Sequence, residues 1–154
     1  MPADAIWCLI GDFGAASQYL SGVVTATVKG AGAGALRTLT SADGSAILER
    51  LETLDEAAQR LSYALLTDTP FRNCLTTMAV HGLAPGRAEL EWSATFEPDG
   101  LPESEAVELL QAALEADSIA LKQLLERFNT SSRQRSLSYL ARNCARHGYL
   151  PSGE

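Results

Sequence analysis

The sequence is poor in the residues that most often build metal sites and disulfide frameworks. Its 154 residues include only two histidines and three cysteines. Cys8, Cys74 and Cys144 are far apart and form no Cys-x-x-Cys pair, which argues for a reducing compartment and against a disulfide or zinc framework. His81 and His147 lie in different segments, without carboxylate or cysteine neighbours at ligand spacing. We therefore predict no metal site and no bound cofactor.

Long apolar runs are also missing. No segment approaches the roughly 20 apolar residues that a membrane-spanning helix requires. The N-terminus, Met1 to Asp4, carries no basic flank leading into an apolar segment, so a secretory signal is not expected. With 46% hydrophobic residues, the chain is long enough to bury a core of its own. These observations predict a soluble, cytoplasmic domain without a membrane span.

Positive charge is scarce and unevenly distributed. Residues 1–127 hold 8 basic and 18 acidic side chains, whereas residues 128–154 hold four arginines and a single acid, Glu154. Because residues 1–127 are strongly acidic, they would repel the phosphate backbone of a nucleic acid, which argues against nucleic acid as a partner. We divide the chain into a domain over residues 1–127 and a basic extension over residues 128–154, in which a short helix is expected. The extension could contact RNA or an acidic lipid surface, but we favour its docking onto the acidic domain.

Signatures of common enzyme classes are absent. The run Gly30-x-Gly32-x-Gly34 invites comparison with a phosphate-binding loop, which requires a helix directly after the glycines. Here a strand is predicted next, so we interpret the run as a connection between strands. The sequence also has no Gly-x-Ser-x-Gly motif and no cysteine with an evident histidine base. No residue can therefore be named as catalytic.

What the sequence does contain is a series of strand patterns between two helical ones. The helical patterns cover residues 3–10 and 102–128. The strand patterns between them cover residues 23–28, 35–40, 45–54, 61–66, 74–80 and 88–97. Short strands in sequence, joined by turn residues, are typical of an antiparallel meander. We predict an α+β fold.

The last strand and the long helix each carry one apolar face. On the strand, the apolar positions are Leu90, Trp92, Ala94 and Phe96. On the helix, they are Leu110, Leu114, Leu121, Leu124 and Phe128. Asp117 falls near the centre of the helical stripe. Either its side chain rotates to the rim, or it is buried, in which case its pKa should rise and the carboxyl could exchange protons with a bound molecule.

The turn at Ala42-Asp43-Gly44 determines how two strands pair. A three-residue loop with Gly44 in the left-handed position sets Arg37 opposite Glu49. A two-residue loop would instead set Arg37 opposite Arg50, a like-charge pair that costs energy. We therefore favour the three-residue loop.

Several segments, in this order, match a known group. They are Ile6-Trp7, Asp12-Phe13, Gly30-x-Gly32-x-Gly34-Ala35-Leu36-Arg37-Thr38-Leu39-Thr40, Asp43-Gly44, Leu48-Glu49-Arg50-Leu51-Glu52-x-Leu54-Asp55, Leu61-Ser62-Tyr63 and Glu91-Trp92-Ser93-Ala94-Thr95-Phe96. Over residues 2–127 the chain resembles the polyketide cyclase/dehydrase-like branch of the SRPBCC superfamily, which includes the START-domain and birch-pollen-allergen proteins. The resemblance implies a helix-grip fold, in which a curved antiparallel sheet wraps a long C-terminal helix around an apolar cavity.

The resemblance also implies a function, although this chain departs from the family pattern in several features. Family members bind lipids, sterols, polyketides or plant hormones, and a minority catalyse cyclisation or dehydration, with no universal catalytic set. A strand usually precedes the first helix, and this chain starts at the helix. Either the true start of the protein lies upstream of Met1, or other residues, such as the extension at residues 128–154 or a second subunit in a homodimer, fill the place of that strand. Cys74 stands where an aromatic residue is expected.

We expect an apolar cavity between the sheet and the long helix. Its wall would consist of Tyr63, Met78, Trp92, Phe96 and Leu114, and its polar groups of Arg37, Glu49, Thr76 and Asp117. In the simpler alternative these apolar side chains are ordinary core, and Arg37 and Glu49 form a surface ion pair.

Three functions remain open. The first is binding of a small hydrophobic ligand such as a lipid or polyketide. The second is a cyclase or dehydrase in which Asp117 and Tyr63 perform acid–base chemistry. The third is a non-catalytic protein-interaction domain.

Overall fold

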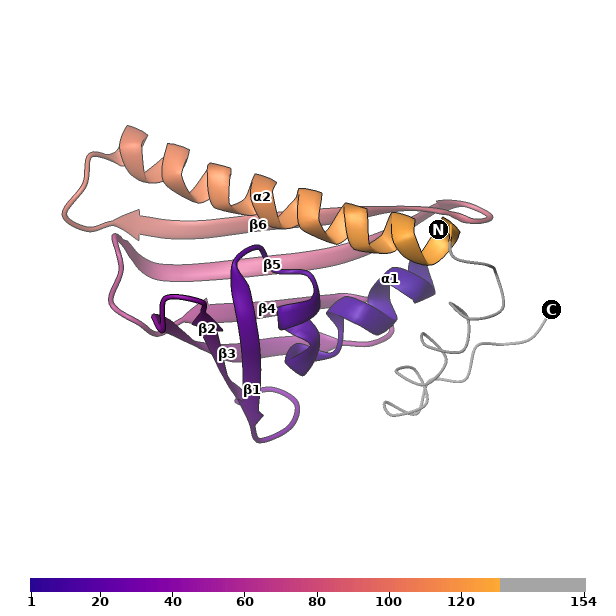
Figure 1. Cartoon of the computed structure of the whole chain (residues 1–154), viewed down its shortest axis with the longest axis horizontal. Helices are drawn as coiled ribbons and strands as arrows, with labels where there is room; N and C mark the ends of the chain where they lie inside the picture. The colour runs from indigo at the N-terminus through magenta and orange to yellow at the C-terminus, as the bar shows by residue number, and fades with distance from the viewer. Residues whose placement is uncertain (131–154) are drawn as a thin grey trace.

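The computed structural model describes residues 1–130, and the predicted helix of the basic extension lies outside the described residues. Two helical elements open the chain: α1 (Ala3–Ile10) and the short 3-10 helix η1 (Phe13–Gln18). Six strands follow: β1 (Val23–Lys29), β2 (Leu36–Ser41), β3 (Ala46–Asp55), β4 (Arg60–Leu65), β5 (Phe71–Ala84) and β6 (Arg87–Pro98). The helix α2 (Glu103–Thr130) completes the described chain (Figure 1).

The six strands form one antiparallel sheet in sequence order, β1-β2-β3-β4-β5-β6. The sheet curls so that β1 and β2 turn toward the viewer in Figure 1, and α2 runs along β6. The predicted α+β architecture, a curved antiparallel sheet with a long C-terminal helix, is confirmed. Among the described residues no strand precedes α1, so β1 and β6 are both edge strands of this sheet.

The predicted hairpin register is also confirmed. Arg37 lies opposite Glu49, and the pairing closes on Thr40 and Ala46. Gly44 has a φ of +85°, the left-handed conformation that a three-residue loop requires. Avoidance of a like-charge cross-strand pair was therefore a sufficient guide to the register.

The β5–β6 hairpin is longer than the sequence predicted. The strand patterns in the sequence ended at residue 80 and resumed at residue 88, but β5 continues to Ala84, which pairs with Arg87. Only Pro85 and Gly86 remain to form the turn, and Gly86 adopts a φ of +72°. The ladder is irregular between Gly82 and Ala84: Gly82 pairs with Ala88 and Ala84 with Arg87, so Leu83 is the extra residue of a bulge.

The core lies on the inner side of the sheet and is closed by the first two helical elements. Buried side chains from α1 and η1 meet the inward residues of β2 to β5. They include Ile6, Trp7, Leu9, Ile10 and Phe13 from the helices, and Leu39, Leu51, Leu61 and Met78 from the strands. None of the helices in residues 1–130 combines the length and hydropathy needed to cross a membrane.

The cysteines differ from expectation in one respect. Cys74 is buried in β5 and is a free thiol. Cys8 is buried in α1 and is disulfide-bonded. The sequence argued against a disulfide framework, so a bond at Cys8 was not expected.

Candidate functional site

A buried ion pair joins the neighbouring strands β2 and β3. Opposed positions on β2 and β3 bring Arg37 and Glu49 together, and Nε of Arg37 donates to Oε2 of Glu49 at 2.9 Å. The Nη2 group of Arg37 donates to the same oxygen, while Nη1 donates to the carbonyl of Phe13 at 3.2 Å. Only 1% of the Arg37 side chain and 10% of the Glu49 side chain are exposed. The pair is interior, so the surface ion pair of the simpler interpretation is wrong.

Two aromatic rings flank the Arg37 guanidinium. Its central carbon lies 4.0 Å from the centroid of the Phe13 ring and 4.8 Å from that of Tyr63. Such cation–π contacts are strengthened when water is excluded. They help to explain how a guanidinium is accommodated in the core, because its charge is met by a carboxylate, a carbonyl and two ring faces.

Burial determines the protonation behaviour of this cluster. It raises the pKa of Glu49, and the adjacent Arg37 partly opposes that shift. Burial likewise raises the pKa of the Tyr63 and Tyr19 hydroxyls, so both phenols stay protonated across the physiological range. The cluster thus offers neutral hydroxyl groups beside a buried carboxylate whose charge is balanced by Arg37.

The predicted polar residue Thr76 is adjacent to this cluster. It lies on β5 opposite Tyr63 and is buried. Cys74, the preceding inward position on the same strand, is also buried, and burial raises the pKa of its thiol.

Asp117 joins α2 to the loop before β1. Its Oδ1 accepts a hydrogen bond of 2.8 Å from the backbone N–H of Ser21. Burial raises the pKa of this carboxyl, and the Ser21 N–H partly opposes the shift. Among residues 1–130 no hydrogen bond joins Asp117 to the Tyr63 hydroxyl, and the roles of the two groups as an acid–base pair stay a prediction.

The predicted wall residues occupy different surroundings. Met78 is fully buried core, with 1% of its surface exposed. Phe96 is half-buried near the far end of β6, edge-on to Phe71 with 5.3 Å between ring centroids. Leu114 is half-buried on the inner side of α2.

Trp92 is the predicted wall residue whose indole N–H has no hydrogen-bond acceptor among the described residues. It is half-buried and packs edge-on against Tyr19, with 6.3 Å between ring centroids. Its Nε1 is buried, and no acceptor within residues 1–130 has hydrogen-bond geometry toward it, although the Tyr63 hydroxyl is near. A buried N–H without a partner is uncommon in native structures.

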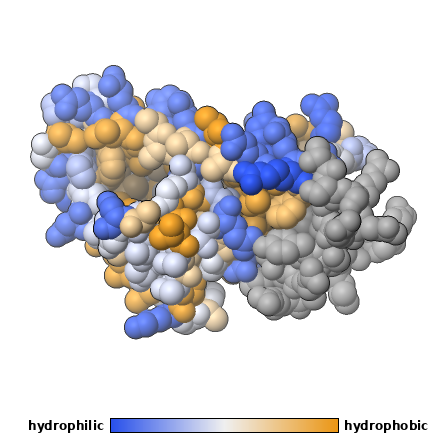
Figure 2. All heavy atoms as spheres, viewed as in Figure 1, coloured by the Kyte–Doolittle hydropathy of each residue, from blue (hydrophilic) through white to orange (hydrophobic). Residues whose placement is uncertain are grey.

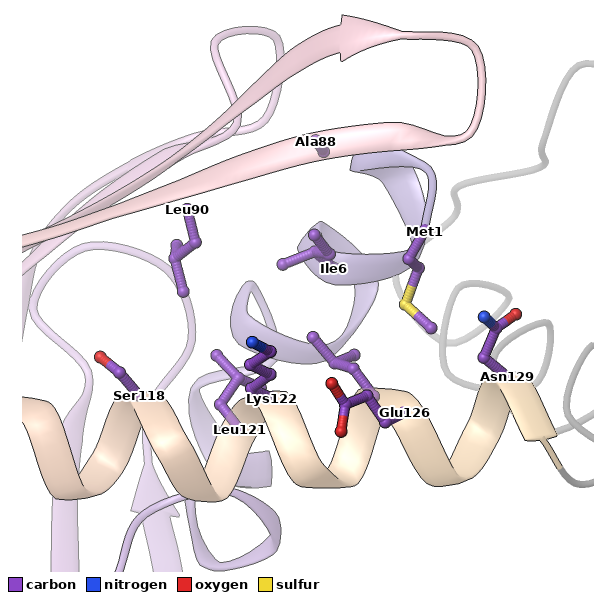
Figure 3. Close-up of a pocket in the computed structure, with 10 residues that line it drawn as sticks. Met1, Ile6, Ala88, Leu90, Ser118, Leu121, Lys122, Glu126 and Asn129 are labelled. Carbon is purple, nitrogen blue, oxygen red and sulfur yellow. The ribbon is translucent and has the colours of Figure 1, made fainter.

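The described structure has a cavity of about 440 Å³ whose lining residues the sequence did not predict. It lies between α1, β6 and the C-terminal half of α2 (Figure 3). The lining residues are Met1, Ile6, Ala88, Leu90, Ser118, Leu121, Lys122, Leu125, Glu126 and Asn129. None of the predicted site residues is among them, but Leu90 directly precedes Trp92 on the inner face of β6 and Ser118 follows Asp117 on α2.

The concave face is open elsewhere as well. Figure 2 shows a hollow below α2 and beside β1, with apolar side chains around its opening. The inward residues of β6 and the α2 residues above them, such as Leu110 and Leu114, are only half-buried. The space between sheet and helix is thus incompletely filled by the described side chains.

Comparison with known proteins establishes the family. A model of the family described as "Polyketide cyclase / dehydrase and lipid transport" matches residues 1–132. The chain belongs to this family. No curated protein matches it.

Solved structures support the same conclusion. An uncharacterised protein from Bacillus thuringiensis is 27% identical with a TM-score of 0.72, over 79% of this chain and 89% of that one. The protein XoxI from Bacillus cereus is also 27% identical with a TM-score of 0.72, over 79% of this chain and 86% of that one. The allergen Ara h 8.0201 is 15% identical with a TM-score of 0.62, over 82% of this chain and 91% of that one, and shows the fold alone. The predicted SRPBCC membership and helix-grip fold are confirmed.

Proposed function

We propose that this protein binds a small hydrophobic molecule between the inner face of β6 and α2. The observation that carries the proposal is the cavity of about 440 Å³ between α1, β6 and α2. Pockets of roughly 300–1,000 Å³ with mostly apolar walls are typical of sites for small ligands. The family description, which includes lipid transport, supports the same class of ligand.

The side chains that line the cavity favour a ligand that is mostly apolar and has a polar group at one end. Ile6, Leu90 and Leu125 supply apolar surface, whereas Lys122 and Glu126 lie on the α2 side (Figure 3). Each 100 Å² of apolar ligand surface removed from water would contribute about 2.5 kcal/mol to binding. A polar group at one end would hydrogen-bond at the α2 side and orient the molecule.

The proposed site extends inward to the buried polar cluster. Trp92 is the next inward position after Leu90, which places it about 7 Å further along the strand. Its unpartnered Nε1 is available to donate to a carbonyl or ether oxygen of a ligand. In this arrangement the predicted residues Arg37, Glu49, Tyr63 and Thr76 form the polar floor, and Asp117 lies at the α2 side.

The first test is native mass spectrometry of the purified protein, followed by denaturing extraction. We expect a co-purifying apolar molecule of a few hundred daltons. Binding of the fluorescent probe 1-anilinonaphthalene-8-sulfonate then reports on the cavity directly.

A matched pair of substitutions locates the site. Leu125→Trp places a larger side chain in the cavity, whereas Ile119→Trp makes the same kind of change on the outer side of α2, where Ile119 is 58% exposed. We expect the first variant to weaken probe binding at least tenfold and the second to leave it unchanged. Equal affinities in two folded variants would refute binding in this cavity.

A further inference from the structure

The side of α2 that faces away from the sheet carries large apolar side chains. α2 runs along β6, so one side of the helix faces the sheet and the opposite side faces away from it (Figure 1). Leu109 and Ile119 are 53% and 58% exposed. A surface helix normally turns its apolar residues toward the core and its polar residues toward water. The exposed apolar residues of α2 therefore point to a second contact that this helix makes.

The residues of α2 fall into three stripes along the helix. The stripe toward the sheet is buried or half-buried and consists of Ala106, Leu110, Leu114, Asp117, Leu121, Leu124 and Phe128. A polar stripe is exposed and consists of Glu108, Gln111, Glu115, Ser118 and Lys122. The third stripe, which we call the outer stripe, is also exposed and consists of Glu105, Leu109, Ala112, Ala116, Ile119 and Gln123.

The outer stripe has the spacing of a coiled-coil seam. Its members recur alternately four and three residues apart, which is the period at which two helices pack their side chains into one another. Leu109 and Ile119 are its large apolar members. Ala112 and Ala116 lie between them, and their small side chains allow a second helix to approach closely. The outer stripe therefore fits another helix.

The charges of α2 indicate which helix fits. Three acids, Glu103, Glu105 and Glu108, lie in its first two turns, whereas both of its bases, Lys122 and Arg127, lie in its last three turns. Two copies of α2 that run in opposite directions bring the acidic start of each helix beside the basic residues of the other. Parallel copies would place like charges together and would align the two helix dipoles unfavourably.

We propose that α2 pairs with α2 of a second copy of this chain, antiparallel and through the outer stripe. The layers of an antiparallel coiled coil place Leu109 of one copy against Ile119 of the other, and Ala112 against Ala116. Glu105 lies level with Gln123 of the other copy, whose amide can donate to the carboxylate. The outer stripe is thus complementary to itself, as a two-fold interface requires. This inference does not depend on the proposed ligand.

A lipid surface fits the outer stripe less well. Helices that lie on membranes typically carry Lys and Arg on their polar face, where they attract anionic headgroups. The polar stripe of α2 has the acids Glu108 and Glu115 and a single base, Lys122. The charge next to the outer stripe therefore favours a protein helix with its own basic end.

Sedimentation equilibrium of the full chain tests the pairing. We expect a reversible monomer–dimer equilibrium, in which the dimer has twice the chain mass of 16.4 kDa. A chain that stays monomeric at every accessible concentration would overturn the proposal. Monomers that bind vesicles of neutral and anionic phospholipid would show that the outer stripe contacts a membrane instead.

A matched pair of variants locates the interface. Ala116→Glu places a carboxylate in the centre of the outer stripe, where the other copy brings Ala112. Gln111→Glu adds the same charge on the polar stripe. Both positions are exposed on the helix, so both variants should fold. We expect Ala116→Glu to weaken dimerisation by about tenfold or more and Gln111→Glu to leave the dissociation constant nearly unchanged. Equal effects on the dissociation constant would show that the dimer forms elsewhere and overturn the proposal.

Introduced cysteines test the direction of the helices. Leu109→Cys and Ile119→Cys are oxidised separately and as an equal mixture, with the wild-type protein as the control for its three cysteines. In the antiparallel pair the two copies of residue 109 are about 15 Å apart along the helix axis, too far for a disulfide. Additional covalent dimer should therefore form only in the mixture. Additional covalent dimer in each variant alone would show parallel helices, and none in the mixture would likewise contradict the proposal.

Discussion

Arg37 donates two hydrogen bonds to a single carboxylate oxygen of Glu49, across two neighbouring strands and inside the core. The remaining Nη group of Arg37 reaches the carbonyl of Phe13. The two ionised groups therefore depend on one another for solvation, because little water reaches either. This relationship leads to the first prediction.

Removing one member of the pair should destabilise the protein more than removing both. Arg37→Met leaves Glu49 buried without a cation, which should cost about 3–5 kcal/mol. In Arg37→Met/Glu49→Leu no charge remains uncompensated, so the loss should be smaller than in the single variant. Urea unfolding followed by circular dichroism measures all three proteins.

An exposed ion pair is the control for this experiment. Arg50 and Glu52 are 2.7 Å apart, with 45% and 33% of their side chains exposed. Arg50→Met should cost under about 1 kcal/mol, because solvent screens the pair and solvates the remaining charge. If Arg37→Met lowered the free energy of unfolding by no more than Arg50→Met does, buried Glu49 would not depend on Arg37 for its stabilisation.

The second prediction concerns the pH dependence of stability at Asp117. Burial raises the pKa of this carboxyl in the folded protein above its unfolded value. Its favourable contribution is therefore fully present below the unfolded pKa and is lost as the pH rises through the folded pKa. Asp117→Asn removes this loss and keeps an oxygen that can accept from the Ser21 N–H. The variant should gain stability relative to wild type as the pH rises from 3 to 7.

A substitution on the exposed side of α2 tests whether that effect is local. Glu108→Gln also removes one negative charge from the helix, but Glu108 is exposed. Its free energy of unfolding should follow the wild-type pH curve closely. If both variants gained equally with pH, the effect would come from net charge and not from the burial of Asp117.

The sequence predicted the parts of the fold that depend on neighbours along the chain. The Arg37–Glu49 pairing followed from one turn and one like-charge contact, and the alternation along β6 followed from period-2 patterning. The length of β5 was missed, because the bulge beside Gly82 looks like a strand end in the sequence. Local rules thus describe the hairpins but not their irregularities.

The cavity depends on distant segments and could not be predicted in this way. Its walls combine Met1 and Ile6 with Leu90 and Leu125, which come together only when α2 crosses back toward α1. The apolar stripe of α2 was visible in the sequence. Its spacing does not show which half of the helix packs against the core and which half lines the cavity. Equally, Phe96 fits a wall residue by pattern, and its packing on Phe71 appears only in the fold.

The third prediction compares the two tryptophans. Trp7 is 2% exposed, and its Nε1 donates to Glu56 at 2.6 Å, whereas Nε1 of Trp92 has no partner of good geometry. Trp7→Phe should therefore cost about 1 kcal/mol more than Trp92→Phe, because it removes a hydrogen bond, while water solvates the exposed carboxylate of Glu56 that remains. Chemical unfolding of both variants measures the difference. Equal losses would indicate that the Trp92 N–H is hydrogen-bonded in solution.

The fourth prediction tests the turn that sets the β2–β3 register. Gly44 has a φ of +85°, and a Cβ there would contact nothing within 4 Å, so any cost of Gly44→Ala comes from backbone strain alone. That cost should be about 1–2 kcal/mol. Gly82→Ala is the matched control, because Gly82 also has open space around it but no positive φ. It should be neutral or slightly stabilising, since alanine restricts the unfolded chain. Equal effects of the two substitutions on the free energy of unfolding would show that the left-handed conformation at Gly44 imposes no strain on an alanine.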